Sequence, residues 1–434
     1  MKAFPFYSAF AILLATFSLT SCLKDKCERE VTYTRFDPVY KTLEEVHTGT
    51  AVKEAPRPLK APGQIYYYNN HMFVVEKHEG IHVIDNSDPS NPQNTAFIKI
   101  PGNQDIAIKD GLLYANTYID LLVIDLTGDQ FPVVGRAENV FNPYYQDLTG
   151  GQIIVEYVET QVTETLSCDE QQYLYEWNGG LFRGGADFEG DVLAVAENSF
   201  DASSGAAPGV GIAGSLAHFS IIGDYLYTIQ HDGYFLEIYD LTQPASPVHA
   251  KTVEVGVHLE TLFPYGDKLF IGSNTGMYIY DNSDPLNPTQ LSLFEHARGC
   301  DPVFVYGNYA YVTLWDGSTC GGGPNQLDVI DISNLTNPVL KKSFSMQNPH
   351  GLSVKGNTLL LCEGDYGLKS FDNTDPVTVG DHLLDQVKNV QAIDVISLPG
   401  SANVAMVIGE GGFYQYSFDN PSDMQFLSLI PVEK

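Results

Sequence analysis

Acidic and histidine residues recur at one position along the chain, beside the start of a short apolar run. The candidates are Asp105, Asp147, His218, Glu260, Asp301 and His350. Four of these lie six residues before the glycine of a predicted turn: Asp105, Glu260, Asp301 and His350. If the segments that follow are equivalent parts of a repeated fold, the spacing gives the side chains one register. We then expect them to form a ring.

Such a ring could serve three purposes. Clustered carboxylates supply the oxygen ligands that calcium prefers, so calcium is the cofactor that these residues would accommodate. A carboxylate beside a histidine can act as a general acid or base. Alternatively, each side chain caps backbone amides of a neighbouring element and has only a structural role. The choice depends on the elements that hold these residues.

The elements are set by an internal repeat, which is clearest at Gly80–Pro92 and Gly276–Pro288. Both segments run through an apolar strand into Asp-Asn-Ser-Asp-Pro. The aspartate that ends this strand recurs with a period near 41 residues as Asp85, Asp125, Asp240, Asp281, Asp331 and Asp372. Because such side chains bond the backbone two residues further on, we expect these aspartates to stabilise turns.

Each copy reads as four short strands separated by tight turns, with no segment of helical period. Four antiparallel strands in each 40–50 residues, repeated many times, are typical of a β-propeller. We predict an all-β fold with a single β-propeller of eight four-stranded antiparallel blades. Seven blades are the alternative, if the irregular unit at 144–213 is an excursion. A glycine-rich insertion at about 160–213 interrupts that unit and is the candidate lid or partner-binding element.

The Val-Ile-Asp strand resembles the bacterial LVIVD-repeat family, and the resemblance covers most of the chain from about residue 63. It implies a propeller and carries no general enzymatic assignment. Two copies depart from the pattern: the third, and the last, in which Ser417 replaces the aspartate. The Trp-Asp ending of WD-type propellers is missing, since the chain has only two Trp.

The N-terminus has the features of an export signal. A short apolar run from Ala9 to Leu19 is too short to span a bilayer and suits a signal peptide. Leu19-Thr20-Ser21-Cys22 resembles the bacterial lipobox, which implies cleavage before Cys22 and lipidation of its thiol. We therefore expect a signal peptide (1–21), a lipidated N-terminus and tether (22–60) and a propeller (61–434). The lipid would bind the protein to a membrane of the bacterial envelope. We expect the outer membrane, and the sequence does not decide between its periplasmic face and the cell surface.

The other cysteines fit an oxidising compartment. Cys300 and Cys320 flank one predicted strand pair and its loop, and we predict a disulfide between them. Cys362 lies in a strand pattern and is predicted to be a buried free thiol. Whether Cys27 and Cys168 pair is left open.

The composition excludes some functions and leaves two. With 23 Lys+Arg against 54 Asp+Glu, the net charge of -31 argues against a nucleic-acid partner. An aromatic content of 12% argues against a disordered chain. The first hypothesis is a non-catalytic binding scaffold on the envelope for a protein or glycan ligand. The alternative is a hydrolase or lyase that uses carboxylate and histidine groups with or without calcium. Its site would be the mouth of the central channel of the propeller, where the ring of candidate residues is expected. The sequence does not decide whether the protein is an enzyme.

Overall fold

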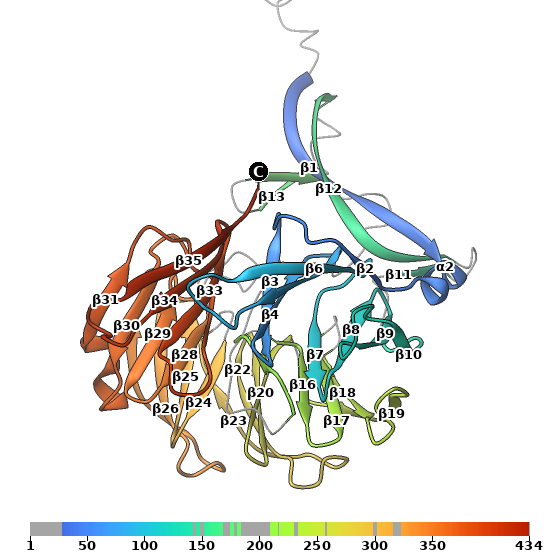
Figure 1. The fold of residues 1–434 in the computed structure, drawn as a ribbon. Helices are drawn as coiled ribbons and strands as arrows, with labels where there is room; N and C mark the ends of the chain where they lie inside the picture. The colour runs from blue at the N-terminus through green and yellow to red at the C-terminus, as the bar shows by residue number, and fades with distance from the viewer. Residues whose placement is uncertain are drawn as a thin grey trace, which may run out of the picture. The chain divides into compact units, whose positions relative to one another are not determined.

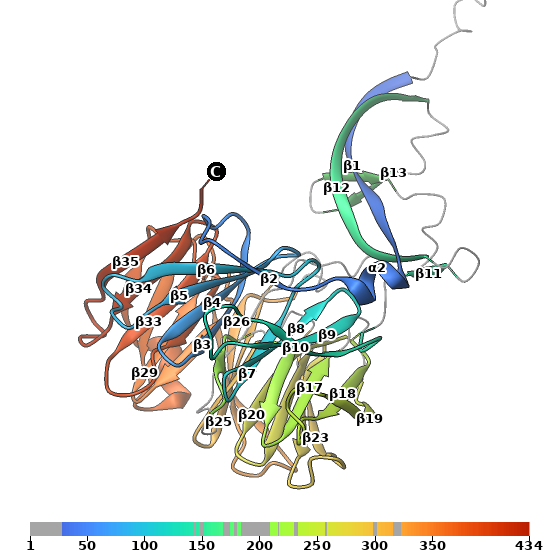
Figure 2. The same cartoon turned by 45° about the vertical axis from the view of Figure 1, so that its right-hand side comes forward.

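The computed structural model describes residues 28–141, 145–147, 152–167, 174–177, 180–183, 209–215, 217–229, 233–256, 258–297, 302–315 and 323–433. The chain forms two compact units. One unit comprises Met1–Pro38 and Tyr157–Val192, and the other comprises Val39–Glu156 and Leu193–Lys434. The larger second unit holds the repeats, and its strands can be followed by colour in Figures 1 and 2.

Seven sheets share one order, in which four strands consecutive in sequence pair antiparallel, and we number them blades 1 to 7. Blade 1 contains β3 (Pro62–Tyr68), β4 (His71–Glu76), β5 (Gly80–Asp85) and β6 (Gln93–Lys99), and blade 2 contains β7 (Ile106–Lys109), β8 (Leu112–Thr117), β9 (Asp120–Asp125) and β10 (Val133–Ala137). Blade 3 contains β16 (Phe219–Ile222), β17 (Tyr225–Ile229), β18 (Phe235–Asp240) and β19 (Val248–Glu254), and blade 4 contains β20 (Leu259–Tyr265), β21 (Lys268–Ser273), β22 (Gly276–Asp281) and β23 (Thr289–Glu295). Blade 5 contains β24 (Val303–Tyr306), β25 (Tyr309–Leu314), β26 (Gln326–Asp331) and β27 (Val339–Ser345). Blade 6 contains β28 (Leu352–Lys355), β29 (Thr358–Cys362), β30 (Leu368–Asp372) and β31 (Leu383–Val387), and blade 7 contains β32 (Asp394–Ser397), β33 (Val404–Gly409), β34 (Gly412–Ser417) and β35 (Gln425–Pro431).

The first strands of the blades form a closed ring. Each contacts the next in the order β3, β7, β16, β20, β24, β28 and β32, and β32 contacts β3 again. The two ends of the ring are joined by a buried amide pair, in which Asn86 Nδ2 donates to Gln415 Oε1 (3.0 Å) and Gln415 Nε2 donates to Asn86 Oδ1 (2.7 Å). A parallel bridge between Leu59 and Val432 adds a second link.

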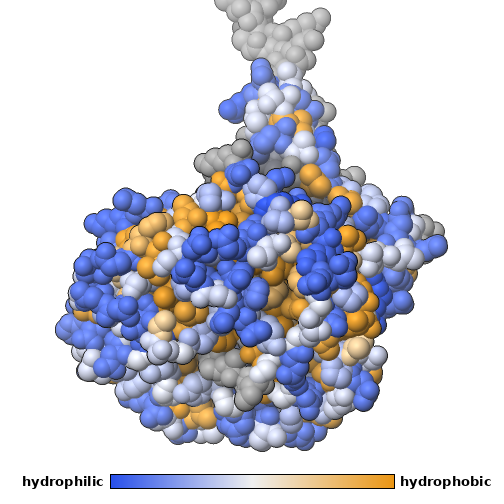
Figure 3. All heavy atoms as spheres, viewed as in Figure 1, coloured by the Kyte–Doolittle hydropathy of each residue, from blue (hydrophilic) through white to orange (hydrophobic). Residues whose placement is uncertain are grey.

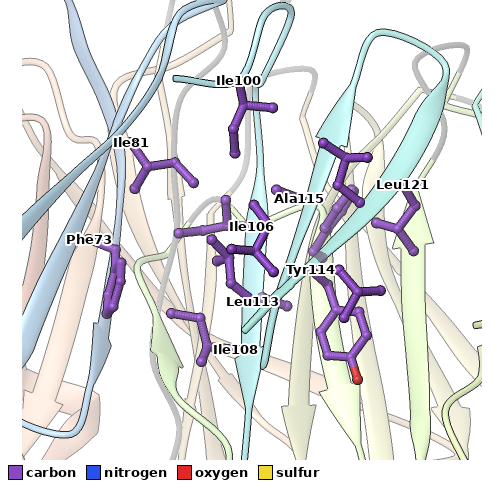
Figure 4. Packing of buried hydrophobic residues seen from close by; sticks show 14 of the residues in the cluster. Phe73, Ile81, Ile100, Ile106, Ile108, Leu113, Tyr114, Ala115 and Leu121 are labelled. Atoms are coloured by element: carbon purple, nitrogen blue, oxygen red, sulfur yellow. The ribbon is translucent and has the colours of Figure 1, made fainter. Parts of the chain in front are cut away.

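Apolar side chains fill the space between neighbouring blades. Figure 4 shows Phe73 and Ile81 of blade 1 beside Ile106 and Leu113 of blade 2, all in one buried cluster. The fourth strands lie at the rim and are largely exposed, so Figure 3 shows a hydrophilic surface broken by smaller hydrophobic areas. Burial of the first three strands of each blade therefore holds the repeats together.

A recurrent joint links several neighbouring blades. An aromatic side chain in the second strand of one blade reaches the turn that follows the third strand of the next blade. Between blades 3 and 4, Tyr227 Oη and Asn282 Oδ1 are 3.1 Å apart, and between blades 5 and 6, Tyr311 Oη donates to Asn373 Oδ1 (2.8 Å). All four side chains are buried.

The same joint has an apolar version between blades 4 and 5. Phe270 replaces the tyrosine and Ile332 replaces the asparagine, and both belong to one buried cluster. A buried hydroxyl is thus matched with a buried amide, and a hydrocarbon ring with a hydrocarbon side chain. In these three joints the two side chains match in polarity, because an unmatched polar group would lose its hydrogen bond in the core.

The eighth sheet does not have the blade pattern. Its strand order is β11-β12-β1-β14-β13, and β1 (Glu28–Thr42) pairs with β14 (Gly180–Arg183) in parallel. The other strands are β11 (Tyr145–Asp147), β12 (Gln152–Ser167) and β13 (Leu174–Trp177). Eight sheets and the all-β fold agree with the sequence prediction, and the sheet orders favour the alternative of seven blades. The unit predicted at 144–213 is not a blade, because its 16-residue strand β12 lies beside β1 and not beside three partners of its own.

The segment predicted as a tether (22–60) contains regular structure from residue 28 on. In the smaller unit, Val31 and Tyr33 of β1 alternate with exposed residues and are buried with Leu166 of β12. This period of two is that of a half-buried strand. Further on lie α2 (Leu43–Thr48), whose Thr42 and Glu45 form a capping box, and β2 (Val52–Glu54), which pairs with β6 at the rim of blade 1.

The joint gives a prediction for stability. Replacing Tyr311→Phe leaves the buried Asn373 oxygen without its donor, so we expect the free energy of unfolding to fall by about 1–3 kcal/mol. The double variant Tyr311→Phe/Asn373→Ile copies the Phe270–Ile332 joint and should recover most of that loss. Urea unfolding of the three proteins measures both effects, and equal stability of the single and double variants would contradict the matching of side chains.

Candidate functional site

The axis of the ring is occupied by the chain itself. Residues 209–215, which we call the plug, run along the inner strands of blades 1 and 2. The plug contains β15 (Ile212–Ala213), which pairs antiparallel with Tyr66 and Tyr67 of β3. Gly211 N donates to Ile108 O of β7 (2.9 Å). The edges of two inner strands thus find their backbone partners in the plug.

The plug ends at a buried carboxylate of blade 7, Asp394. Ser215 donates to it through its backbone N (3.2 Å to Oδ2) and its Oγ (3.1 Å to Oδ1), and Val395 N donates to Oδ1 (2.8 Å). Leu352 N of blade 6 donates to Ser215 Oγ (3.1 Å). Gly351 allows this approach, since a Cβ there would lie 2.1 Å from Asp394 Oδ1. The plug therefore joins blades 1, 2, 6 and 7.

Burial raises the pKa of Asp394 to about 7, although the hydrogen bonds from Val395 and Ser215 favour the charged form. Asp394 is not among the candidates that the sequence analysis selected. The available signal was an acid directly before a β-branched pair, Val395-Ile396, as Asp105 stands before Ile106. Both aspartates also accept the N–H of the residue that follows them.

We call the end of the ring where the inner strands begin the mouth. Asp105 lies there and links blade 2 to blade 3. Its Oδ2 accepts the N–H groups of His218 (2.6 Å) and Phe219 (3.0 Å). His218 Nδ1 is 3.5 Å from the same oxygen and 3.4 Å from Gln64 Nε2. The structure thus brings Asp105 and His218 together, with the carboxylate capping backbone amides of the neighbouring blade.

His350 lies at the mouth between blades 5 and 6 and has a different environment. Its ring is 4.6 Å from the ring of Trp315, measured between centroids. Burial lowers the pKa of His350 to about 4, so the imidazole is neutral near pH 7. Within the described residues neither imidazole nitrogen has a hydrogen-bond partner. The imidazole is therefore available to an external donor or acceptor.

The remaining ring candidates do not complete one site. Glu260 is half-buried in β20 of blade 4. Asp147 lies in β11 of the eighth sheet and not in an inner strand, so the expected register does not extend to it. Asp301 lies outside the described residues, as do Cys22, Cys300 and Cys320. Among the described residues no three acidic, histidine or cysteine side chains form a group that could hold a metal.

The repeated aspartates form the turns that close the third strands. In each, Oδ1 accepts the N–H of the residue two positions on, at 2.7–2.9 Å, for Asp85, Asp125, Asp240, Asp281, Asp331 and Asp372. Hydrogen bonds from the hydroxyl group and the backbone N–H of that Ser or Thr hold the pKa of each carboxyl below its usual range. Hydrogen bonds from Ser333 and Lys341 lower the pKa of Asp331 to about 2.

The sequence analysis did not predict two pairs of ionisable side chains inside the blades. In blade 1, His82 Nε2 lies 2.7 Å from Glu76 Oε2, and in blade 6, Lys369 pairs with Glu363. His82 and Lys369 both stand three residues before the turn aspartate, and that register was the signal. Cys362 is a buried free thiol, as its strand pattern predicts, and burial raises its pKa.

Comparisons with known proteins identify the repeat and list solved structures that resemble this chain. The sequence model of the LVIVD repeat matches residues 63–95 and 297–345. A solved structure from Lactobacillus plantarum is similar at 12% identity, with 89% of this chain and 97% of that chain covered and a TM-score of 0.52. The periplasmic gluconolactonase PpgL of Pseudomonas aeruginosa has 12% identity, coverage of 88% and 97%, and a TM-score of 0.48. BamB from Moraxella catarrhalis has 8% identity, coverage of 89% and 98%, and a TM-score of 0.47.

No protein of curated function matches the chain in sequence. In the described part of the chain, no helix has both the length and the apolar character that crossing a bilayer requires. The candidate site therefore has to be interpreted from its own geometry.

The plug gives a pH prediction. The carboxyl of Asp394 titrates near 4 when the chain is unfolded and near 7 when it is folded. Between these values the folded protein binds the extra proton at Asp394, so this carboxyl alone lowers the free energy of unfolding as the pH rises from 4 to 7. His350, whose pKa burial lowers to about 4, contributes in the opposite direction and is present in every variant. We expect Asp394→Asn to lose the first contribution, which makes the slope of stability against pH more positive, and Ser215→Ala to retain it. Urea unfolding at several pH values tests this, and an equal slope in Asp394→Asn and the parent protein would contradict it.

Proposed function

We propose that this LVIVD-repeat β-propeller is a non-catalytic binding scaffold, held on the bacterial envelope by a lipid on Cys22. Its ligand site is the part of the mouth between blades 5 and 6. The observation that carries the proposal is the environment of His350, a neutral imidazole beside Trp315 with no internal hydrogen-bond partner among the described residues.

Other groups converge on the same place. A Cβ at Gly364 would lie 2.4 Å from Asn348 Nδ2 and 3.2 Å from His350 Nε2, so the amide and the imidazole face one point. Tyr366, in the loop between β29 and β30, is 44% exposed at the same end of blade 6. Two aromatic rings with an amide and an imidazole provide flat apolar faces and uncharged hydrogen-bonding groups.

This chemistry suits a glycan. A sugar ring can place an apolar face against Trp315 or Tyr366, while its hydroxyl groups exchange hydrogen bonds with Asn348 and His350. The hydrolase or lyase alternative receives less support. Two carboxylates at the mouth, Asp105 and Asp394, already accept hydrogen bonds from backbone N–H groups. A protein ligand at the same surface is the other outcome of the test.

Matched tyrosine variants test the ligand site. Tyr366 lies at the mouth, whereas Tyr306, which is 41% exposed, ends β24 at the opposite end of blade 5. Against a panel of neutral polysaccharides and peptidoglycan sacculi, we expect the mature protein in detergent to bind at least one. Tyr366→Ala and His350→Ala should weaken that binding about tenfold, since each removes contacts worth roughly 1–1.5 kcal/mol. Tyr306→Ala should bind as the parent does.

Two results would overturn the glycan site. One is equal weakening by Tyr306→Ala and Tyr366→Ala, and the other is binding of no polysaccharide while proteins of the envelope bind through Tyr366. Thermal unfolding of each variant confirms that the fold is retained.

The anchor is tested separately. In a bacterial host we expect the full-length chain to incorporate labelled palmitate, because several acyl chains on one residue would hold it at the membrane. Cys22→Ser should abolish the label, and Cys27→Ser should keep it. Labelling of Cys22→Ser at the parent level would rule out the lipobox assignment.

A further inference from the structure

A cavity lies at the side of the ring, between blades 2 and 3, and we call it the side pocket. Its volume is about 270 Å³. One wall is the end of β10 and the loop after it, with Glu138 and Asn139, and the other is formed by β18 and β19 with Glu237 and His249. At roughly 30 Å³ for each water molecule, the pocket has room for about nine non-hydrogen atoms. That volume suits a small organic group better than a bare ion.

The base of the side pocket is a buried carboxylate. Glu237 is 6% exposed, and its Oε2 accepts hydrogen bonds from Thr252 Oγ1 (2.6 Å) and lies 2.7 Å from His249 Nε2. The imidazole of His249 is half-exposed and packs edge-on against Tyr239, at 5.4 Å between centroids. A carboxylate thus lies deep in the pocket with a flat ring beside it.

The walls are fixed by contacts outside the pocket. Asn139 N donates to Asp120 Oδ1 (2.9 Å), and Asp120 is a fully buried carboxylate that also pairs with Arg136. Tyr239 Oη donates to Val140 O (3.1 Å) across the gap between the blades. The pocket is therefore largely formed before a ligand binds, which lowers the entropic cost of binding.

Two lining residues of the side pocket are acidic, Glu138 and Glu237, and none is a lysine or arginine. Glu237 already bonds Thr252 and lies beside His249, whereas Glu138 is on the exposed wall. The guanidinium of Arg136 is bound to Asp120 and to the carbonyl oxygens of Val46 and Gly49. A cationic ligand would meet Glu138 at the wall and would share Glu237 with His249.

We propose that the side pocket binds a guanidinium group, carried either by a small molecule or by an arginine side chain of a partner protein. The planar guanidinium presents several N–H donors to a carboxylate and stacks on flat rings. In this arrangement its donors bond Glu138 and share the carboxylate of Glu237 with His249 and Thr252, and its face lies against the imidazole of His249. An arginine side chain or a free guanidino-alkylamine has the size that the volume allows.

Calorimetric titration of the mature protein in detergent tests the proposal with two probes. Agmatine represents a free small molecule, and a capped pentapeptide with a central arginine represents a partner protein. A second peptide has citrulline in place of arginine. Citrulline has nearly the same shape and no charge, so comparing it with the arginine peptide separates the effect of charge from that of shape. We expect at least one guanidinium probe to bind saturably and the citrulline peptide to bind about tenfold more weakly or not at all. Binding of agmatine alone identifies a small-molecule site, and binding of the peptide identifies a site for a partner's arginine.

Three variants locate the binding. Glu237→Gln removes the charge and should weaken binding about tenfold or more. Ala137→Leu, at the end of β10, fills the pocket without changing a charge and should abolish binding. The control is Asp328→Asn, because Asp328 is a buried carboxylate at the same register in blade 5, hydrogen-bonded to Gln326. It should bind as the parent does.

The proposal is overturned if neither guanidinium probe binds at millimolar concentration. It is also overturned if the citrulline peptide binds as tightly as the arginine peptide, or if Ala137→Leu, shown to be folded by thermal unfolding, binds unchanged. None of these results bears on the mouth, because Tyr366 and His350 lie in blade 6 and at its start.

Discussion

The structure depends on one requirement at the joints between blades: each polar group that a blade buries must meet a polar group of the next blade. Tyr227 meets Asn282 and Tyr311 meets Asn373, whereas Phe270 faces Ile332. The last joint also closes the ring, since no blade combines strands from both ends of the chain. There the paired amides of Asn86 and Gln415 replace the hydroxyl–amide bond. Hydrogen bonds of this kind add modest stability when made and cost more when one partner is missing, so the joints select one arrangement of neighbours.

The same requirement explains the acidic residues at the mouth. Inner strands present backbone N–H groups toward the axis, and each such group needs an acceptor. Asp105 accepts two of them at blade 3, and Asp394 accepts two, one from the plug and one from Val395. Asp105, one of the carboxylates that the sequence offered for calcium or catalysis, is committed to the backbone. His350 differs because burial keeps it neutral and no described side chain bonds its ring.

Local chemistry in the sequence predicts much of the fold. The turn aspartates were predictable because the bond to the backbone two residues on needs only a side chain and its neighbours. The pairing of β12 with β1 was not predicted, because the two strands are more than a hundred residues apart in the chain. Alternation along one strand does not identify its neighbour. Asp394 was missed because its importance comes from Ser215, which the chain brings to it from a distant segment. The side pocket was beyond prediction for a similar reason, since it lies between two blades and belongs to neither.

The plug also constrains the order in which the molecule is assembled. It follows blades 1 and 2 in the chain and precedes blades 6 and 7, and it bonds to all four. A chain that emerges from its N-terminus can place residues 209–215 on the free edges of β3 and β7 while the ring is still open. The later blades then close around it, and Asp394 bonds Ser215 as the last inner strand arrives. Had the plug come from beyond blade 7, a completed ring would have to be threaded, which is a slower and more hazardous route.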